Sequence, residues 1–181
     1  MFGADDPTPL ETRSRIAYAT GETGDFAQAV ALHREVLRDQ ERLFGPDDPR
    51  TLDTRHHIAY WTGRGGAREE GLRLHEELLP DLERVLNPTD AAVLEERHYI
   101  AYWHGMPGRH DHALELHAEL LRDRIAAFGE EHEQVVFSRM NICKFLGASG
   151  HLREALDGYG ELLPLITGSA ARTTRTSSWS G

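Results

Sequence analysis

Cysteine, lysine and long apolar segments are scarce in this 181-residue sequence. The single cysteine, Cys143, excludes an internal disulfide and any cysteine-rich metal site. No apolar run approaches the ~18 residues of a membrane-spanning helix, and the first residues lack the basic and apolar segments of a secretory signal. We therefore expect a cytoplasmic protein. The one lysine among 20 basic residues points to a bacterial genome rich in G and C.

Positive charge is also in short supply, because the formal net charge is −10. Such a chain lacks the basic stripe that neutralises phosphates, which argues against nucleic acid and anionic membranes as partners. No HExxH or CxxC spacing, Gly-rich phosphate loop or Ser-His-Asp pattern is present. His110 and His112 would point apart on a helix, so they do not suggest a shared ion. We expect no catalytic residues, no cofactor and no metal site.

A segment that recurs every 42 residues dominates what the sequence does contain. Arg55–Gly63 (RHHIAYWTG) returns as Arg97–Gly105 (RHYIAYWHG), 42 positions further on, and related segments begin at Arg13 and Arg139. A fixed period of this length is typical of a repeat solenoid, in which each unit buries its apolar face against the next.

The columns of this repeat predict one helix–turn–helix per unit and an all-α fold with eight helices. Glycine recurs at the turns, at Gly24, Gly66, Gly108 and Gly150. The predicted repeats are 2–43, 44–85, 86–127 and 128–166, a single array over 1–166, followed by a disordered tail over 167–181. The first helices are expected at 8–21, 50–63, 92–105 and 133–147, and the second helices at 25–43, 67–85, 109–127 and 151–166.

The motifs resemble the tetratricopeptide repeat (TPR) family, in its form of roughly 42 residues found in kinesin light chains and bacterial regulatory proteins. The resemblance rests on pairs such as Ile58-Ala59, on second-helix motifs such as Phe26–Val30, and on the joint Leu43–Pro49 (LFGPDDP). It implies a right-handed α-solenoid whose first helices line a concave surface.

The helical period assigns one face of the first helices to that concave surface. Polar and aromatic side chains gather on it, and tyrosine and histidine combine flat apolar area with a polar tip. By the resemblance, Asn141 stands where the family often has an asparagine that binds a peptide backbone. The predicted peptide-binding residues are Tyr18, Asp53, His56, His57, Tyr60, Arg64, Glu95, His98, Tyr99, Tyr102 and Asn141.

Other repeated residues are assigned to packing. His33, His75 and His117 lie in the apolar arc of the second helices, where we expect buried rings. Arg13, Arg55, Arg97 and Arg139 are expected to pair with carboxylates of the preceding unit, with Asp39, Asp81 and Asp123 as candidates. Trp61 and Trp103 are expected to wedge between helices, and Cys143 to act as a small hydrophobe.

The predicted function is a non-enzymatic scaffold or adaptor that binds a protein or peptide segment. The acidic residues Asp53 and Glu95 are expected to favour basic residues in the ligand. One alternative is self-association, as a homodimer, through an uncapped last helix. Its apolar residues are Leu156, Leu162, Leu163, Leu165 and Ile166. Another alternative is a sensor fragment of a larger signalling ATPase or transcription regulator.

Overall fold

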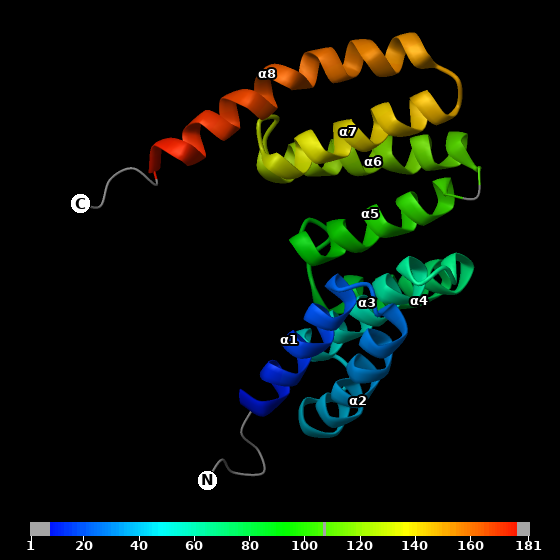
Figure 1. Ribbon diagram of the computed structural model, residues 1–181, viewed down its shortest axis with the longest axis vertical. Coiled ribbons are helices and arrows are strands. Elements are labelled where there is room, and N and C mark those ends of the chain that lie inside the picture. Colours follow the sequence, from blue (N-terminus) through cyan, green and yellow to red (C-terminus); the bar gives the residue numbers. More distant parts are fainter. Residues whose placement is uncertain (1–7, 107, 177–181) are drawn as a thin grey trace. The chain divides into compact units, whose positions relative to one another are not determined.

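The computed structural model describes residues 8–106 and 108–176, which form helices and short turns without any strand (Figure 1). Eight helices succeed one another in this described part of the chain. They are α1 (Thr8–Glu22), α2 (Phe26–Phe44), α3 (Pro49–Arg64), α4 (Arg68–Val85), α5 (Ala91–Gly105), α6 (His110–Phe128), α7 (Glu133–Ala148) and α8 (Leu152–Thr176).

The all-α class and the eight predicted helices are confirmed, and seven helices begin and end within one residue of their predicted bounds. The exception is α8, which continues to Thr176 instead of ending near residue 166. Helix propagation from a formed end is easy compared with nucleation, so the segment after 166 extends the helix where a disordered tail was predicted. Residues 177–181 of that tail, and Phe2 of the first repeat, lie outside the described residues.

Contacts divide the chain into two compact units, residues 1–103 and 104–181, with the boundary near the end of α5. The single array over 1–166 therefore stays a prediction. In the first unit α1 packs on α2, α2 on α3 and α3 on α4, as expected for stacked helix pairs. Its main core cluster is Leu52 of α3, Leu78 and Leu82 of α4, and Val93 of α5. Full burial of each such side chain contributes about 1.5–3 kcal/mol.

The joint between repeats ends one helix and starts the next with residues suited to both tasks. Gly45 adopts φ 86°, a left-handed conformation that glycine accepts without strain, and its N–H donates to the carbonyl of Glu41. Asp48 then accepts a hydrogen bond from the N–H of Arg50, and Pro49 occupies the first turn of α3. The joint therefore separates α2 from α3 within one residue of the predicted bounds 25–43 and 50–63.

Successive repeats interlock through an aromatic ring that lies against a glycine. Trp61 is 1% exposed, and a Cβ built on Gly21 would lie 2.5 Å from its ring. Trp103 meets Gly63 in the same way, at 2.6 Å. Both tryptophans therefore wedge between helices as predicted, and the glycines are needed for close approach.

In the second unit α6 packs on α7, and α7 on α8. His117 is buried and stacks on Phe145, with 5.4 Å between ring centroids. Cys143 is buried, as predicted for a small hydrophobe. Leu162 is only 2% exposed, so its assignment to an open apolar edge is wrong, because this side chain faces the interior of the unit.

Two of the repeated arginines, Arg13 and Arg55, pair with predicted aspartates, but within one repeat. Arg13 donates to Asp39 at 2.6 Å and Arg55 to Asp81 at 2.8 Å. Each pair joins the first helix of a repeat to its own second helix, because the aspartate lies 26 residues after the arginine. The prediction of pairing with the preceding unit is therefore wrong. These pairs are partly exposed and contribute at most about 1 kcal/mol each.

Candidate partner-binding face and a buried His-Glu-His cluster

The predicted site residues of the first unit form a connected aromatic surface over α1, α3 and α5. Tyr18 of α1 contacts the ring of His57 at 5.3 Å, and Tyr60 of α3 contacts Tyr99 of α5 at 5.2 Å. His56 bridges these groups, because its ring lies 5.5 Å from His57 and 5.1 Å from Tyr99. We call this surface the aromatic face.

Exposure differs across the aromatic face and its rim. Tyr18 is 43% exposed, and Asp53, Arg64 and Glu95 are also exposed. The remaining predicted residues of the face are half-buried, so that their edges reach solvent while their rings pack. They are His56, His57, Tyr60, Tyr99 and Tyr102. Arg64 lies beside Tyr60, donating to its hydroxyl at 3.3 Å.

Two predicted site residues are placed wrongly by the helical period. His98 is 5% exposed and Asn141 is 6% exposed, so neither lies on an open face. The side-chain amide of Asn141 donates to the carbonyl of Phe137 one turn earlier, at 2.9 Å. A helical wheel gives the direction of a side chain, but not whether a neighbouring helix covers it. The carry-over of a peptide-binding asparagine to Asn141 is therefore not supported.

A cavity of about 90 Å³ lies beside the aromatic face, between α3, α4 and α5. Its walls combine leucines with carboxylates. The lining residues are Pro49, Leu52, Asp53, His56, Leu82, Leu86, Ala92, Glu95 and Glu96. The carboxylates of Asp53 and Glu95 are on exposed residues, whereas Glu96 is fully buried. An apolar wall with anionic groups at one side suits the aliphatic stem and charged end of a basic side chain.

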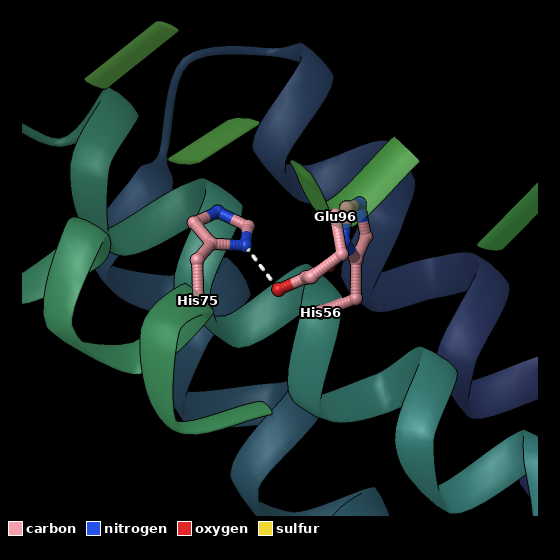
Figure 2. Close-up of side chains that lie close together, drawn as sticks. All are labelled: His56, His75 and Glu96. Carbon is pink, nitrogen blue, oxygen red and sulfur yellow. Dashed lines mark hydrogen bonds and ion pairs between the residues drawn. The ribbon is translucent and has the colours of Figure 1, made fainter. Parts of the chain in front are cut away.

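Glu96 forms the centre of a buried cluster with two histidines (Figure 2). Its carboxylate accepts from Nδ1 of His75 at 2.6 Å through one oxygen, and contacts Nδ1 of His56 at 2.6 Å through the other. The three side chains come from α3, α4 and α5. Both Glu96 and His75 are 0% exposed, and of the three residues Glu96 and His56 line the cavity.

The hydrogen bonds determine where the protons lie. Each imidazole carries its proton on Nδ1 when it donates to Glu96, which leaves Nε2 of a neutral ring as an acceptor. Burial alone would lower the pKa of His56, but its hydrogen bond to Glu96 and the charges of Glu96, Glu95 and Asp53 raise that pKa above the usual value. Burial opposes ionisation of Glu96, yet its two imidazole partners hold the carboxyl pKa below its usual range.

The sequence singled out His56 for the groove and His75 for packing, and it missed Glu96 altogether. The signal was available in the repeat register. At the position of Glu96 the preceding repeat has Thr54 and the following one has Ser138, both fully buried. A long carboxylate in a column of small hydroxyl residues indicates a local departure from the packing rule.

Comparison with known proteins agrees with this architecture. The tetratricopeptide repeat family model matches residues 10–50. A search of curated protein sequences found no match. No helix in the described part of the chain is long and apolar enough to cross a membrane. The match to residues 10–50 and the shared fold agree with the tetratricopeptide repeat that the register predicted.

Several solved structures share the fold. A variant of a kinesin light chain-like protein of Podosopora anserina, with nearly identical TPR-like repeats, has a TM-score of 0.73 and 19% identity over 94% of this chain and 81% of that chain. Another crystal structure of the same description has a TM-score of 0.70 and 20% identity, over 93% of this chain and 80% of that chain. BtubC (BKLC) from P. vanneervenii has a TM-score of 0.75 and 18% identity, over 90% of this chain and 66% of that chain. At these identities the likeness concerns the fold.

Proposed function

We propose that the protein is a non-enzymatic scaffold or adaptor that binds a peptide segment of another protein on the aromatic face. The repeat fold is consistent with a protein-interaction module. The observation that carries the finer proposal is the continuity of the face, where ring contacts link α1, α3 and α5 beside a cavity. Half-buried rings offer contact area at little entropic cost, because packing already restricts them.

The chemistry of the rim selects the kind of peptide. Asp53 and Glu95 are exposed carboxylates beside leucines that line the cavity. An arginine or lysine of the peptide can pack its methylene groups on Leu82 and Leu86 while its charge meets the carboxylates. Arg64 at the other side of the face can meet a carbonyl or carboxylate of the same segment. We therefore propose a peptide ligand with at least one basic residue.

The direct test uses a displayed library of unstructured peptides, followed by affinity measurement on the selected sequences. The Tyr60→Ala/Tyr102→Ala variant should weaken binding by about 2 kcal/mol or more, or at least ~30-fold, because aromatic anchors dominate such interfaces. A Tyr159→Ala variant serves as control, since this tyrosine lies on α8 in the second unit. Circular dichroism establishes that the variants are folded. Equal affinity for wild type and the double variant would rule out the aromatic face.

Self-association through α8 is a second candidate, favoured by a separate observation. Leu156 is 71% exposed and Leu163 is 60% exposed on α8, with Leu152 and Ile166 also open to solvent. Exposed apolar residues in such number on one helix mark an interaction surface. We propose a second copy of the chain as the occupant of this surface.

Light scattering distinguishes this second candidate from a monomeric adaptor. The Leu156→Asp/Leu163→Asp variant should convert a dimer to a monomer, because each substitution places a charge in the apolar contact. Leu162 is unsuitable for this test, since it is buried and its substitution would disturb the fold. A wild-type protein that is monomeric at high concentration would remove self-association and leave the peptide-binding proposal intact.

A further inference from the structure

Among the described residues of the first unit, only the His56–Glu96–His75 cluster brings a fully buried carboxylate together with two imidazoles from other helices. A buried carboxylate is costly unless positive charge or strong hydrogen bonds compensate it. The helices α3, α4 and α5 each supply one member. The cluster therefore joins three elements around one negative charge.

Repeat register shows that the fold itself does not demand this carboxylate. The trio that corresponds one repeat earlier is Ser14, His33 and Thr54, and one repeat later it is His98, His117 and Ser138. In both of these trios a small hydroxyl residue fills the buried position of Glu96. Only the middle trio combines two histidines with a carboxylate, so packing alone does not explain Glu96.

We infer that His56, His75 and Glu96 form a binding site for one divalent transition-metal ion of the zinc class. Two imidazole nitrogens and one carboxylate oxygen are the donor set that Zn²⁺, Co²⁺ and Ni²⁺ accept, whereas Mg²⁺ and Ca²⁺ prefer oxygen ligands alone. Three protein ligands leave a further coordination position for water or another group, as in open zinc sites. The metal site shares His56 and the cavity with the proposed peptide-binding face, but metal binding itself does not require the peptide.

The donor atoms are already close to the required positions. All three lie within 4.8 Å of one another. Ligand atoms around a tetrahedral zinc ion, at bond lengths of about 2.0–2.1 Å, are separated by about 3.3 Å. Each Nδ1 now lies 2.6 Å from a different oxygen of Glu96, so the distance to whichever oxygen binds the metal must widen by about 0.7 Å.

Access and charge favour the same conclusion. The cavity beside α3 is lined by His56 and Glu96, so an ion and a further ligand have an entry path to two of the three donors. Asp53 and Glu95 line the same cavity and contribute negative charge near the ion. A divalent cation at the cluster would offset two of the three negative charges of Asp53, Glu95 and Glu96.

The experiment titrates the metal-free full-length protein with Zn²⁺ by calorimetry and with Co²⁺ by visible absorption. We expect one tight equivalent. A neutral imidazole that binds the metal through Nδ1 moves its proton to Nε2, so protons leave the protein only from a ring that was charged before binding. Proton release is measured by repeating the calorimetry in buffers of different ionisation enthalpy. Co²⁺ should give the visible bands of a low-coordinate site with nitrogen ligands.

Matched variants locate the site. Glu96→Thr inserts the residue of the preceding repeat and should weaken Zn²⁺ binding by about 100-fold or more, as should His75→Asn. His112→Asn removes a histidine of α6 that pairs with Glu115 and should leave the affinity unchanged. The melting temperature of wild type should rise with Zn²⁺, and that of Glu96→Thr should not.

Three outcomes would overturn the inference. They are the absence of a tight equivalent in wild type, equal affinity in wild type and Glu96→Thr, and loss of binding in His112→Asn instead. The first outcome would mean that the cluster is a hydrogen-bonded packing unit and binds no metal. Circular dichroism and the melting curve without metal establish that Glu96→Thr is folded, and His75→Asn repeats the test without altering the carboxylate.

Discussion

At the scale of single residues, buried histidines show how the same side chain takes different roles in successive repeats. His33, His75 and His117 occupy one column and are all fully buried, as predicted from the apolar arc. His75 donates to Glu96, whereas neither ring nitrogen of His33 has a hydrogen-bond partner among the described residues. A ring without partners is stable only in its neutral form, because a buried charge has no compensation.

This difference predicts a loss of stability in acid. Burial, with a smaller contribution from His57, lowers the pKa of His33 to about 4, and burial lowers that of His117 to about 4. As pH falls from about 6.5 towards 4, the unfolded chain binds protons that the folded chain does not, so the free energy of unfolding decreases. The His33→Phe variant should recover up to about 3 kcal/mol of that decrease. Urea unfolding over this pH range measures it.

The control for the acid prediction is His112→Phe, because His112 is half-exposed and pairs with Glu115 at the surface. Its pH dependence should match that of wild type. The free energy of unfolding of His33→Phe could instead decrease in acid as much as that of wild type. That result would mean that the buried ring of His33 accepts a proton in the folded state, for example with a water molecule at one of its nitrogens.

At the scale of elements, helix spacing depends on contacts between glycine and large aromatic residues of the next repeat. Gly63 of α3 faces Trp103 on one side and Gly71 of α4 on another, where a Cβ on Gly71 would lie 2.7 Å from the Cα of Gly63. Three helices therefore meet at closer range than side chains of ordinary size allow. Glycine normally weakens a helix, so its presence here indicates a packing requirement.

Gly63→Ala should destabilise the protein by about 1–3 kcal/mol, because the new methyl group would meet the Trp103 ring at 2.6 Å. Gly160→Ala is the matched control, since nothing lies within 4 Å of a Cβ built there. That substitution should stabilise α8 by about 0.5–1 kcal/mol through helix propensity. Thermal and denaturant unfolding of both variants measures the change in the free energy of unfolding, which should decrease for Gly63→Ala and increase for Gly160→Ala. A stabilising Gly63→Ala would show that Trp103 moves aside without cost.

At the scale of the whole molecule, the net charge of −10 favours basic partners and raises their rate of association. The exposed carboxylates Asp53 and Glu95 line the cavity beside the aromatic face, whereas Glu69 and Glu83 are exposed on α4. Both pairs carry a charge of −2. Neutralising each pair in turn therefore distinguishes a local contact at the cavity from an effect of the net charge.

Asp53→Asn/Glu95→Gln should weaken the binding of a selected basic peptide by about 1–3 kcal/mol and reduce its salt dependence, because two direct ionic contacts are lost. Glu69→Gln/Glu83→Gln changes the net charge equally and should alter only the association rate, by a small factor. Surface plasmon resonance at several ionic strengths measures the dissociation constant and the association rate constant. Equal effects of the two double variants would show that the cavity makes no specific contact with the basic residue.

Local sequence patterns specify the repeat, the helices and their turns. A 42-residue register with glycine at each turn and Pro49 after Asp48 specifies helix bounds through local chemistry, so seven helices agree within one residue. It also identified the buried histidine column and the wedging tryptophans, because helical period separates a packed face from a free one. The end of α8 was missed, since propagation of a formed helix needs no strong local signal.

The packing of the helices on one another determines which residues of a face are covered and which side chains meet across helices. His98 and Asn141 share the predicted face yet are buried, whereas Asp53 and Glu95 are open. Glu96 meets His56 and His75 because α3, α4 and α5 converge at that level, although 40 and 21 residues separate the partners. Periodicity encodes direction around one helix axis, but burial and long-range pairing depend on where the other helices lie.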